Sequence, residues 1–255
     1  MGADNKKKGQ KVENRPLLDE PDARPATLRP QQPLASLPPL TIPEMPMLVT
    51  EHRASSRTGI DVSHYQGRID WKAVRNTGKV LYAYVKATES TSLVDDTYAY
   101  NIREAHNAGI AVGCYHFFSP STSAEEQLKN FTSTVNLSGH DLVPMVDVEL
   151  RGKSALPDFI KRLKAFIEGI EKHYKVKPIL YTSVNFYNKY LASTFSRYPL
   201  WIANYSRQPV ITRGKTILWQ RSCTTVVPGI SKAIDTDKLI NGATLKSLMY
   251  RPTFP

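Results

Sequence analysis

The sequence predicts an α/β protein whose strands close into a TIM-like barrel, and three observations support this fold class. From residue 58 onward, strand-like and helix-like segments alternate, which is typical of parallel strands covered by helices. The strand-like segments are apolar, as expected for strands that are buried on both faces. All Phe, Trp and Tyr residues lie beyond residue 57. We therefore expect the barrel to begin near residue 58 and to close with eight strands.

The expected elements follow in order along the chain. Seven segments are strand-like: 58–63, 80–90, 110–118, 142–150, 177–183, 198–205 and 216–222. An eighth strand is expected near Asp235. Four segments between them have helical spacing: 95–109, 121–135, 154–175 and 183–193. The first helix should stop at Gly109, and Ser123 with Glu126 is a capping-box start for the second.

Residues 1–57 differ in composition from the remainder. They contain 9 of the 18 prolines, and proline stiffens a chain while removing backbone donors. We expect 1–57 to be a Pro-rich disordered arm or linker and 58–255 to be the barrel domain. No apolar stretch follows the basic start, so no intact signal peptide is visible, and no run reaches the ~18 apolar residues of a membrane span.

The net charge of +11 does not by itself indicate a nucleic-acid-binding protein. Lys and Arg are scattered, and in FIKRLKAFIEGIEKHYKVK they alternate with core positions, which is typical of a solvated helix face. We expect no nucleic-acid partner, although a basic surface favours approach to an anionic polymer. The only cysteines, Cys114 and Cys223, lack metal-ligand spacing and are expected to be buried free thiols. Neither a metal nor another cofactor is expected.

The stretch LVPMVDVEL places two acids at the end of an apolar strand. Because side chains alternate along a strand, Asp147 and Glu149 point to the same side, about 6–7 Å apart. Asp61, Glu89 and Asp235 also lie at the ends of predicted strands. Two carboxylates at the edge of a core are costly unless a site uses them, so these acids predict a site at one end of the barrel.

Aromatic and amide side chains recur at corresponding positions: His116, Phe118, Tyr181, Trp201, Tyr205, Trp219 and Gln220. Rings stack on sugar faces, and carboxylates and amides bind hydroxyls, so such a cleft suits a sugar polymer. Taken singly, a strand-end Asp is more often a turn or cap residue, and a Tyr or Trp is more often core. The prediction depends on their convergence at one end of the barrel.

Several longer motifs occur in an order that resembles a known family. They are GIDVSHYQGRIDW, YVKATEST, VDDTYAYN, AGIAVGCYHFF, VPMVDVE, PILYTS, LWIANY, LWQ and AIDTDKLING. In this order they are similar to the Chalaropsis-type muramidases, the glycoside hydrolase family 25 lysozymes, over about residues 58–245. The resemblance implies a flattened β/α barrel with fewer helices than strands. It also implies cleavage of the β-1,4 bond from N-acetylmuramic acid to N-acetylglucosamine in peptidoglycan.

The acidic cluster of this family maps onto Asp61, Asp147, Glu149 and Asp235. Two positions depart from its usual pattern: KATEG reads KATES here, with Ser90, and a VDLN-like ending reads IDTD, with Asp237. Both positions lie beside expected site residues. They are expected to alter a subsite or a loop while the main carboxylates remain.

The chemistry of glycoside hydrolysis suggests roles for the acids. Glu149, near other carboxylates and apolar valines, should have a raised pKa and act as the proton donor. Asp147 would remain ionised and either attack the sugar or orient the substrate's 2-acetamido group as an internal nucleophile; we favour the second, with retention. Asp61 and Asp235 would hold Asp147 and the sugar in place. Glu89 and the aromatic and amide residues would bind substrate.

Two other functions stay open at this point. One is a non-catalytic barrel that only binds glycan, although a degenerate barrel would be expected to have lost its proton donor. The other is a chitin-type N-acetylglucosaminidase, which a comparison of chitin oligomers with peptidoglycan would distinguish. The expected partner is the peptidoglycan glycan strand, with no nucleic acid, no membrane span and a monomeric chain. An extracytoplasmic location (secreted, periplasmic or cell-envelope) is expected from that substrate.

Overall fold

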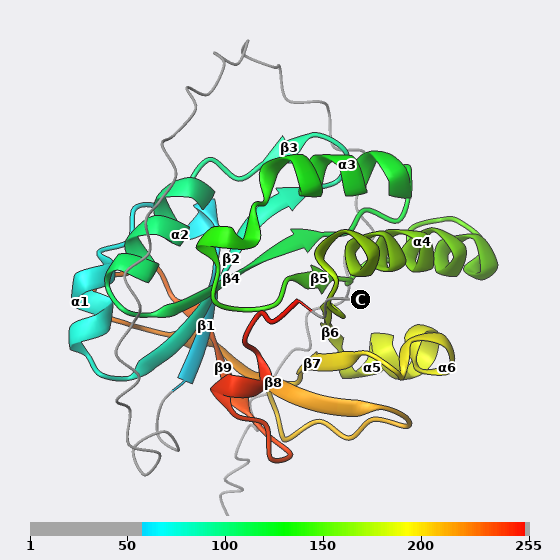
Figure 1. Cartoon of the computed structure of the whole chain (residues 1–255). Helices are drawn as coiled ribbons and strands as arrows, with labels where there is room; N and C mark the ends of the chain where they lie inside the picture. Colours follow the sequence, from blue (N-terminus) through cyan, green and yellow to red (C-terminus); the bar gives the residue numbers. More distant parts are fainter. Residues whose placement is uncertain (1–57, 253–255) are drawn as a thin grey trace, which may run out of the picture. The chain divides into compact units, whose positions relative to one another are not determined.

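Eight strands form a closed barrel in the computed structural model, which describes residues 58–252. In ring order the strands are β1 (Thr58–Val62), β2 (Val80–Glu89), β4 (Ala111–Phe117), β5 (Met145–Asp147), β6 (Ile179–Ser183), β7 (Pro199–Ala203), β8 (Lys215–Thr225) and β9 (Ile234–Leu239). Pairing of β1 with both β2 and β9 closes the ring. The short β3 (Leu93–Val94) pairs only with the end of β2. The predicted barrel is confirmed (Figure 1).

The last strand differs from the expected parallel arrangement. Strands β1 to β8 are parallel to their neighbours around the ring, but β9 is antiparallel to both β8 and β1. No helix lies between β8 and β9, and a direct hairpin reverses the chain, whereas a parallel return needs a long crossover. As a result the start of β9, with Asp235, lies at the same end of the barrel as the carboxyl ends of the parallel strands.

The helices cover the outside of the parallel strands. They are α1 (Trp71–Asn76), α2 (Tyr98–Asn107), α3 (Ala124–Thr134), α4 (Leu156–Tyr174), α5 (Val184–Phe186) and α6 (Ala192–Phe195). A π-helical turn, Tyr187–Leu191, divides the helix that the sequence predicted over 183–193. The Ser123 hydroxyl caps α3 by accepting from the Glu126 amide, and Gly109 follows α2 with a left-handed φ of 75°. Helix α1, capped by Asp70, was not predicted.

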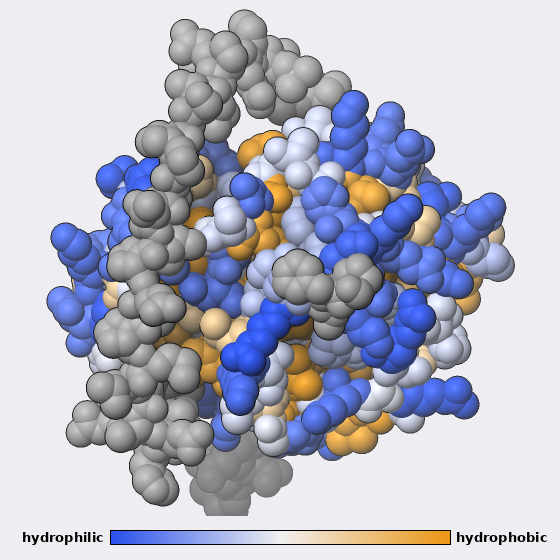
Figure 2. All heavy atoms as spheres, viewed as in Figure 1, coloured by the Kyte–Doolittle hydropathy of each residue, from blue (hydrophilic) through white to orange (hydrophobic). Residues whose placement is uncertain are grey.

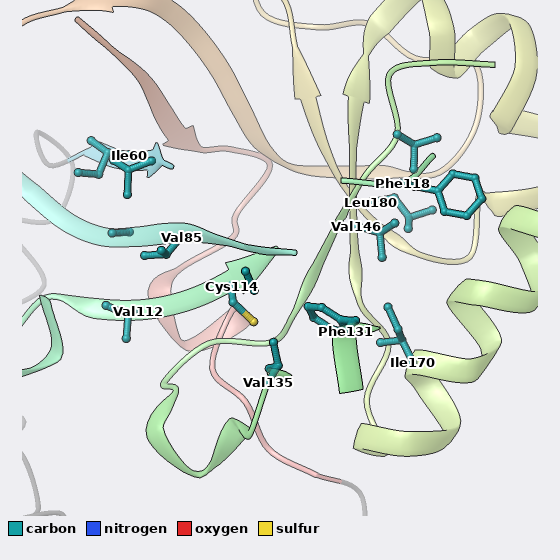
Figure 3. Close-up of a cluster of buried hydrophobic side chains, with 14 of the residues drawn as sticks. Ile60, Val85, Val112, Cys114, Phe118, Phe131, Val135, Val146, Ile170 and Leu180 are labelled. Atoms are coloured by element: carbon teal, nitrogen blue, oxygen red, sulfur yellow. The ribbon is translucent and has the colours of Figure 1, made fainter. Parts of the chain in front are cut away.

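Two apolar layers hold the barrel together. The outer layer lies between strands and helices, and Figure 3 shows Cys114, Phe131 and Val135 close together within it. The inner layer fills the barrel and contains large side chains such as Tyr84, Trp201 and Leu218. Figure 2 shows a mainly hydrophilic surface with scattered hydrophobic patches. Because strand residues alternate between these two layers, the phase of each strand decides which residues can reach a site in the barrel.

The predicted arm, residues 1–57, lies outside the described residues. Within residues 58–252, no helix combines the length and the apolar character that crossing a membrane requires. Cys114 is buried as expected, but Cys223 is exposed, so that part of the expectation is wrong. Cys223 lies on β8 beyond Gln220, where the strand leaves the barrel wall and its side chains reach solvent.

Candidate active site

A pocket of about 350 Å³ opens at the end of the barrel where the parallel strands terminate. Five carboxyl side chains line it: Asp61, Glu89, Asp147, Glu149 and Asp235. Asp61 pairs directly with Asp235 in the β1–β9 register. Asp147 closes β5, and Glu149 follows it with the intervening Val148 fully buried. The structure thus brings together all five acids that the sequence placed at strand ends.

A hydrogen-bond relay fixes the position of Asp61. The Gln220 side-chain amide donates to Asp61 Oδ2 at 2.9 Å. The Gln220 carbonyl oxygen accepts from the Tyr181 hydroxyl at 2.7 Å and from the Tyr205 hydroxyl at 2.9 Å. Both of its lone pairs are therefore used, and the amide can turn only its N–H side toward Asp61. Burial raises the pKa of Asp61 well above its usual value, and the charge of Asp235 adds to this rise.

Asp147 and Glu149 are also poised to hold protons. Burial raises the pKa of Asp147 well above its usual value, with further rises from the charges of Glu149 and Asp61. Burial likewise raises the pKa of Glu149, and burial with the Glu149 charge raises the pKa of Asp235 to about 6. Contrary to the sequence-based argument, burial favours the neutral form of Asp147 as well as that of Glu149. Asp147 Oδ1 has no hydrogen-bond partner among residues 58–252.

Lys86 is the one cation among the residues that line this pocket, and the sequence analysis missed it. Its Nζ lies 2.5 Å from Glu89 Oε2 and 5.3 Å from the centre of the Phe117 ring. Lys86 lowers the pKa of Asp147, against the larger effect of burial. A register shift in the β2–β4 pairing between Lys86 and Thr88 marks a bulge. The bulge lets Lys86 and Glu89, three residues apart, face the same pocket.

Aromatic side chains complete the lining. Tyr181 and Tyr205 line the pocket as the sequence predicted, together with Tyr65, Tyr115 and Phe117, which it did not. Tyr65 and Tyr205 are 64% and 55% exposed, unusual values for large rings. Exposed rings at the mouth of a polar pocket are suited to stacking on sugar faces. Tyr115 and Phe117 each precede an expected residue, His116 or Phe118, by one position. The opposite choice of inward-facing side along β4 would therefore have identified them.

Two of the expected binding residues, His116 and Phe118, face the helices and do not line this pocket. The His116 ring lies 2.7 Å from Thr88 Oγ1 and 3.1 Å from Gln127 Oε1, and burial lowers its pKa to about 4. Phe118 is fully buried against Phe159 and Phe166. Both side chains are on the opposite face of the strand from the pocket residues Tyr115 and Phe117.

Trp201 and Trp219 also lie outside the pocket lining. Trp201 fills the barrel interior, where its indole N–H donates to Asp237 Oδ1 at 2.9 Å. The Trp219 indole N–H donates to the Asn204 carbonyl at 2.7 Å, and the strand neighbours of Trp219, Leu218 and Gln220, take the inward positions. These two tryptophans support residues of the barrel and its loops instead of the pocket surface.

The two departures from the family pattern have distinct surroundings. Ser90 adopts a left-handed φ of 51°, a conformation suited to the glycine of the usual pattern, and its carbonyl accepts from the Asn130 amide at 3.1 Å. Asp237 is fully buried below the pocket, and its Oδ2 has no partner among the described residues. Burial and the charge of Asp61 raise the pKa of Asp237 well above its usual value. Within residues 58–252 no group of three or more His, Cys, Asp or Glu side chains could hold a metal ion.

Comparison with known proteins gives consistent similarities. A family model described as "Glycosyl hydrolases family 25" matches residues 60–230. The chain is 39% identical over 182 residues to "Uncharacterized protein YegX" of Escherichia coli (strain K12), covering 69% of this chain and 67% of that protein. It is 32% identical over 206 residues to "Lysozyme M1" of Streptomyces globisporus, covering 74% and 69%. The solved structure of the bacterial lysozyme from Streptomyces coelicolor superposes with a TM-score of 0.68 and 29% identity, covering 76% and 97%.

Proposed function

This chain belongs to glycosyl hydrolases family 25, and from that premise we propose how its pocket performs the reaction. The protein is a glycoside hydrolase that acts on peptidoglycan as a muramidase, cleaving the bond from N-acetylmuramic acid to N-acetylglucosamine. The observation that carries the proposed mechanism is the convergence of Asp61, Asp147, Glu149 and Asp235 in one pocket rimmed by exposed tyrosines.

Glu149 is the proposed proton donor. Cleavage requires a proton on the leaving glycosidic oxygen, and the desolvation that raises the pKa of Glu149 helps its carboxyl to hold that proton. Glu149 follows the strand end, so it lies nearer the mouth of the pocket than the more deeply buried Asp147. This placement supports proton transfer to a glycan that lies across the opening.

Asp147 is the proposed orienting residue for the substrate's acetamido group. Its carboxyl group lines the pocket, where it can accept a hydrogen bond from the acetamide N–H. The acetamide oxygen then attacks the anomeric carbon while Glu149 protonates the leaving oxygen. Water, deprotonated by Glu149, opens the resulting ring with overall retention. An ionised Asp147 is needed, and Lys86 is the pocket cation that favours it.

Asp61 on β1 and Asp235 on β9 hold the reacting sugar and Asp147 from another part of the barrel wall. Gln220 bonds Asp61 and is itself fixed by Tyr181 and Tyr205, so this side of the pocket is preorganised. Glu89, paired with Lys86, and the ring of Tyr205 are proposed substrate contacts. His116, Phe118, Trp201 and Trp219 would influence binding only through the residues that they support.

The site of action follows from the substrate. Peptidoglycan lies outside the cytoplasmic membrane, so we propose an extracytoplasmic location for the active protein. The pocket is built from one chain, and a monomer would suffice for activity.

Analysis of the reducing ends released from purified peptidoglycan tests the function. A muramidase produces N-acetylmuramic acid at the new reducing ends. New N-acetylglucosamine ends, or comparable cleavage of chitin oligomers, would contradict the specificity and favour a chitin-type glucosaminidase. Glycan binding with no release of reducing ends would favour a binding barrel.

Product stereochemistry and covalent trapping test the mechanism. Proton NMR should show retention in the first-formed product, and a slow fluorinated substrate should leave no sugar on the protein. A sugar-sized mass on the peptide carrying Asp147 would establish direct attack instead. An inverted product would rule out both schemes and favour a water activated by an acid such as Asp61.

A further inference from the structure

Four cations gather around the loop that follows Glu149, and the proposed mechanism uses none of them. Arg151 and Lys153 lie in the loop, Arg162 lies on α4 and Lys189 lies in the π-helical turn after β6. Among residues 58–252, no carboxylate forms an ion pair with any of the four; Asp158, one turn before Arg162, does not reach it. We call Arg151, Lys153, Arg162 and Lys189 the basic cluster.

Two guanidinium groups of the basic cluster converge on one serine. Arg162 Nη2 donates to Ser154 Oγ at 2.6 Å, and Arg151 Nη1 donates to the Ser154 carbonyl. Like charges brought this close repel each other, and burial strengthens the effect because both arginines are only half-exposed. A bound anion would offset that repulsion, and paired guanidinium forks match the geometry of a carboxylate.

Tyr190 brings the third cation to the same place. Arg151 lies 5.9 Å and Lys189 5.1 Å from the centre of the Tyr190 ring. Both cations lower the pKa of the Tyr190 phenol, Lys189 more than Arg151. The ring therefore links Lys189 to Arg151, although Arg151 lies in the loop after β5 and Lys189 in the π-helical turn.

The loop is held firmly enough to present these charges. Arg162 Nε donates to the Pro120 carbonyl at 3.0 Å, which ties α4 to the loop after β4. Gly152 has a left-handed φ of 65°, and a Cβ there would lie 3.0 Å from Pro120 Cγ. A larger residue would not fit without a shift, so the chain is closely packed between Arg151 and Lys153.

The basic cluster lies within reach of a substrate in the pocket. Arg151 is two residues beyond Glu149, at most about 7 Å along the chain. A muramic acid bound beside Glu149 carries a stem peptide on its lactyl group, and that peptide bears free carboxylates. We propose that the basic cluster is a binding site for a carboxylate of the peptidoglycan stem peptide, which makes stem-bearing glycan the preferred substrate.

This inference rests on the proposed function and can fail separately from it. The test compares kcat/KM on soluble glycan oligomers that keep their stem peptides with kcat/KM on the same oligomers after an amidase has removed them. Both preparations are first stripped of phosphate-bearing wall polymers. The wild type should favour the stem-bearing oligomers, and raising the salt concentration should reduce that preference because it screens exposed charges.

The test variant is the double substitution Lys153→Gln and Lys189→Gln, which leaves the Ser154 contacts of both arginines in place. We expect the ratio of the two kcat/KM values to fall roughly 3- to 10-fold, as the loss of two partly exposed ion pairs predicts. The matched control is Lys172→Gln with Lys177→Gln. It removes the same charge from exposed residues at the end of α4 and before β6, at the opposite end of the barrel. This control should keep the wild-type ratio.

A direct binding measurement complements the kinetics. A fluorescent stem tetrapeptide should bind the Glu149→Gln protein, and the added double substitution should weaken that binding by a similar factor. Equal wild-type kcat/KM on both oligomers, or the same ratio in the double variant and the wild type, would overturn the inference. A preference that appears only when phosphate-bearing polymers are retained would also overturn it and identify phosphate as the ligand. Release of no reducing ends from either oligomer would contradict the proposed function itself.

Discussion

Strands β4 and β5 lie side by side and end at the same pocket, yet their sequences led to different outcomes. On β5 and just after it, the polar residues Asp147 and Glu149 face the pocket, and Val146 and Val148 face the helices. On β4, the polar residue His116 faces the helices, and the pocket receives Tyr115 and Phe117. A shift of one residue along a strand exchanges a substrate contact for a core residue.

Comparison of the two strands shows that residue type alone does not indicate which side of a barrel wall a side chain occupies. His116 is polar but satisfied in the core by Thr88 and Gln127. The pair Asp147 and Glu149 is different, because burying two carboxylates in an apolar layer without partners is costly. Acids at two-residue spacing fix the phase of a strand, whereas a single histidine does not.

The largest expected effect is on the pocket side of β5. Glu149→Gln keeps the shape of the side chain but cannot donate a proton, so turnover should fall about 10²–10⁴-fold. Circular dichroism and thermal melting should show that the fold persists, because Glu149 lies at the pocket surface. Wall-lytic activity within tenfold of wild type in a folded variant would exclude Glu149 as the proton donor.

A pair of neighbouring phenylalanines tests the two faces of β4 directly. Phe118→Ala should lower the free energy of unfolding by about 3–5 kcal/mol, because it empties a fully buried position. Phe117→Ala should cost less stability, since the ring is only half-buried and lines the pocket. Its main effect should be a higher KM. Urea denaturation and steady-state kinetics of both variants check this; a larger KM change for Phe118→Ala would reverse the assignment of faces.

Asp237 tests whether a carboxyl on the inward face below the pocket is neutral in the folded protein. The carboxyl lies below the pocket, facing Asp61 and Asp235, with Trp201 and Arg221 as the groups that favour its charge. Its raised pKa means that folding favours the neutral form. The wild type should therefore lose stability relative to Asp237→Asn as the pH rises above about 4, the unfolded value.

Melting temperatures of the two proteins between pH 4 and 8 provide the measurement for Asp237. Asp237 interacts with Asp61 and Asp235, so the difference between the curves reports this carboxyl together with its effect on those two neighbours. We expect the difference to grow with pH in favour of the asparagine variant. Parallel curves would mean that Asp237 titrates in the fold as it does in the unfolded chain.

Much of the fold could be predicted from sequence because it depends on local patterns. Apolar strands alternating with amphipathic helices predicted seven strands that overlap observed ones, an eighth near Asp235, and the helices α2, α3 and α4; β5 is shorter than the predicted segment 142–150. The antiparallel β9 was not predicted, since its direction depends on the helix-free connection over residues 226–233, which strand composition does not encode. Helix α1 was missed because six residues capped by Asp70 give too short a periodic pattern.

The candidate site was predictable where side chains carry charge. The five acids meet in the pocket, but Lys86 could not be foreseen, because a bulge in β2 turns it to the same side as Glu89. Trp201 and Trp219 were expected at the pocket because of their type, whereas the structure uses their N–H groups to hold Asp237 and Asn204.

The smallest expected effect concerns a thiol on the helix-facing side of β4. Cys114 is fully buried and burial raises the pKa of its thiol, so neither reagent access nor thiolate formation is favoured. Cys223 on β8 is exposed. A thiol-specific chromogenic reagent should therefore modify one cysteine in the native protein and two in denaturant. Cys223→Ser should abolish the native reaction and leave one thiol that reacts only after unfolding. Rapid labelling of Cys114 in that variant would mean that the outer layer opens readily, and that the two faces of β4 differ less than the structure indicates.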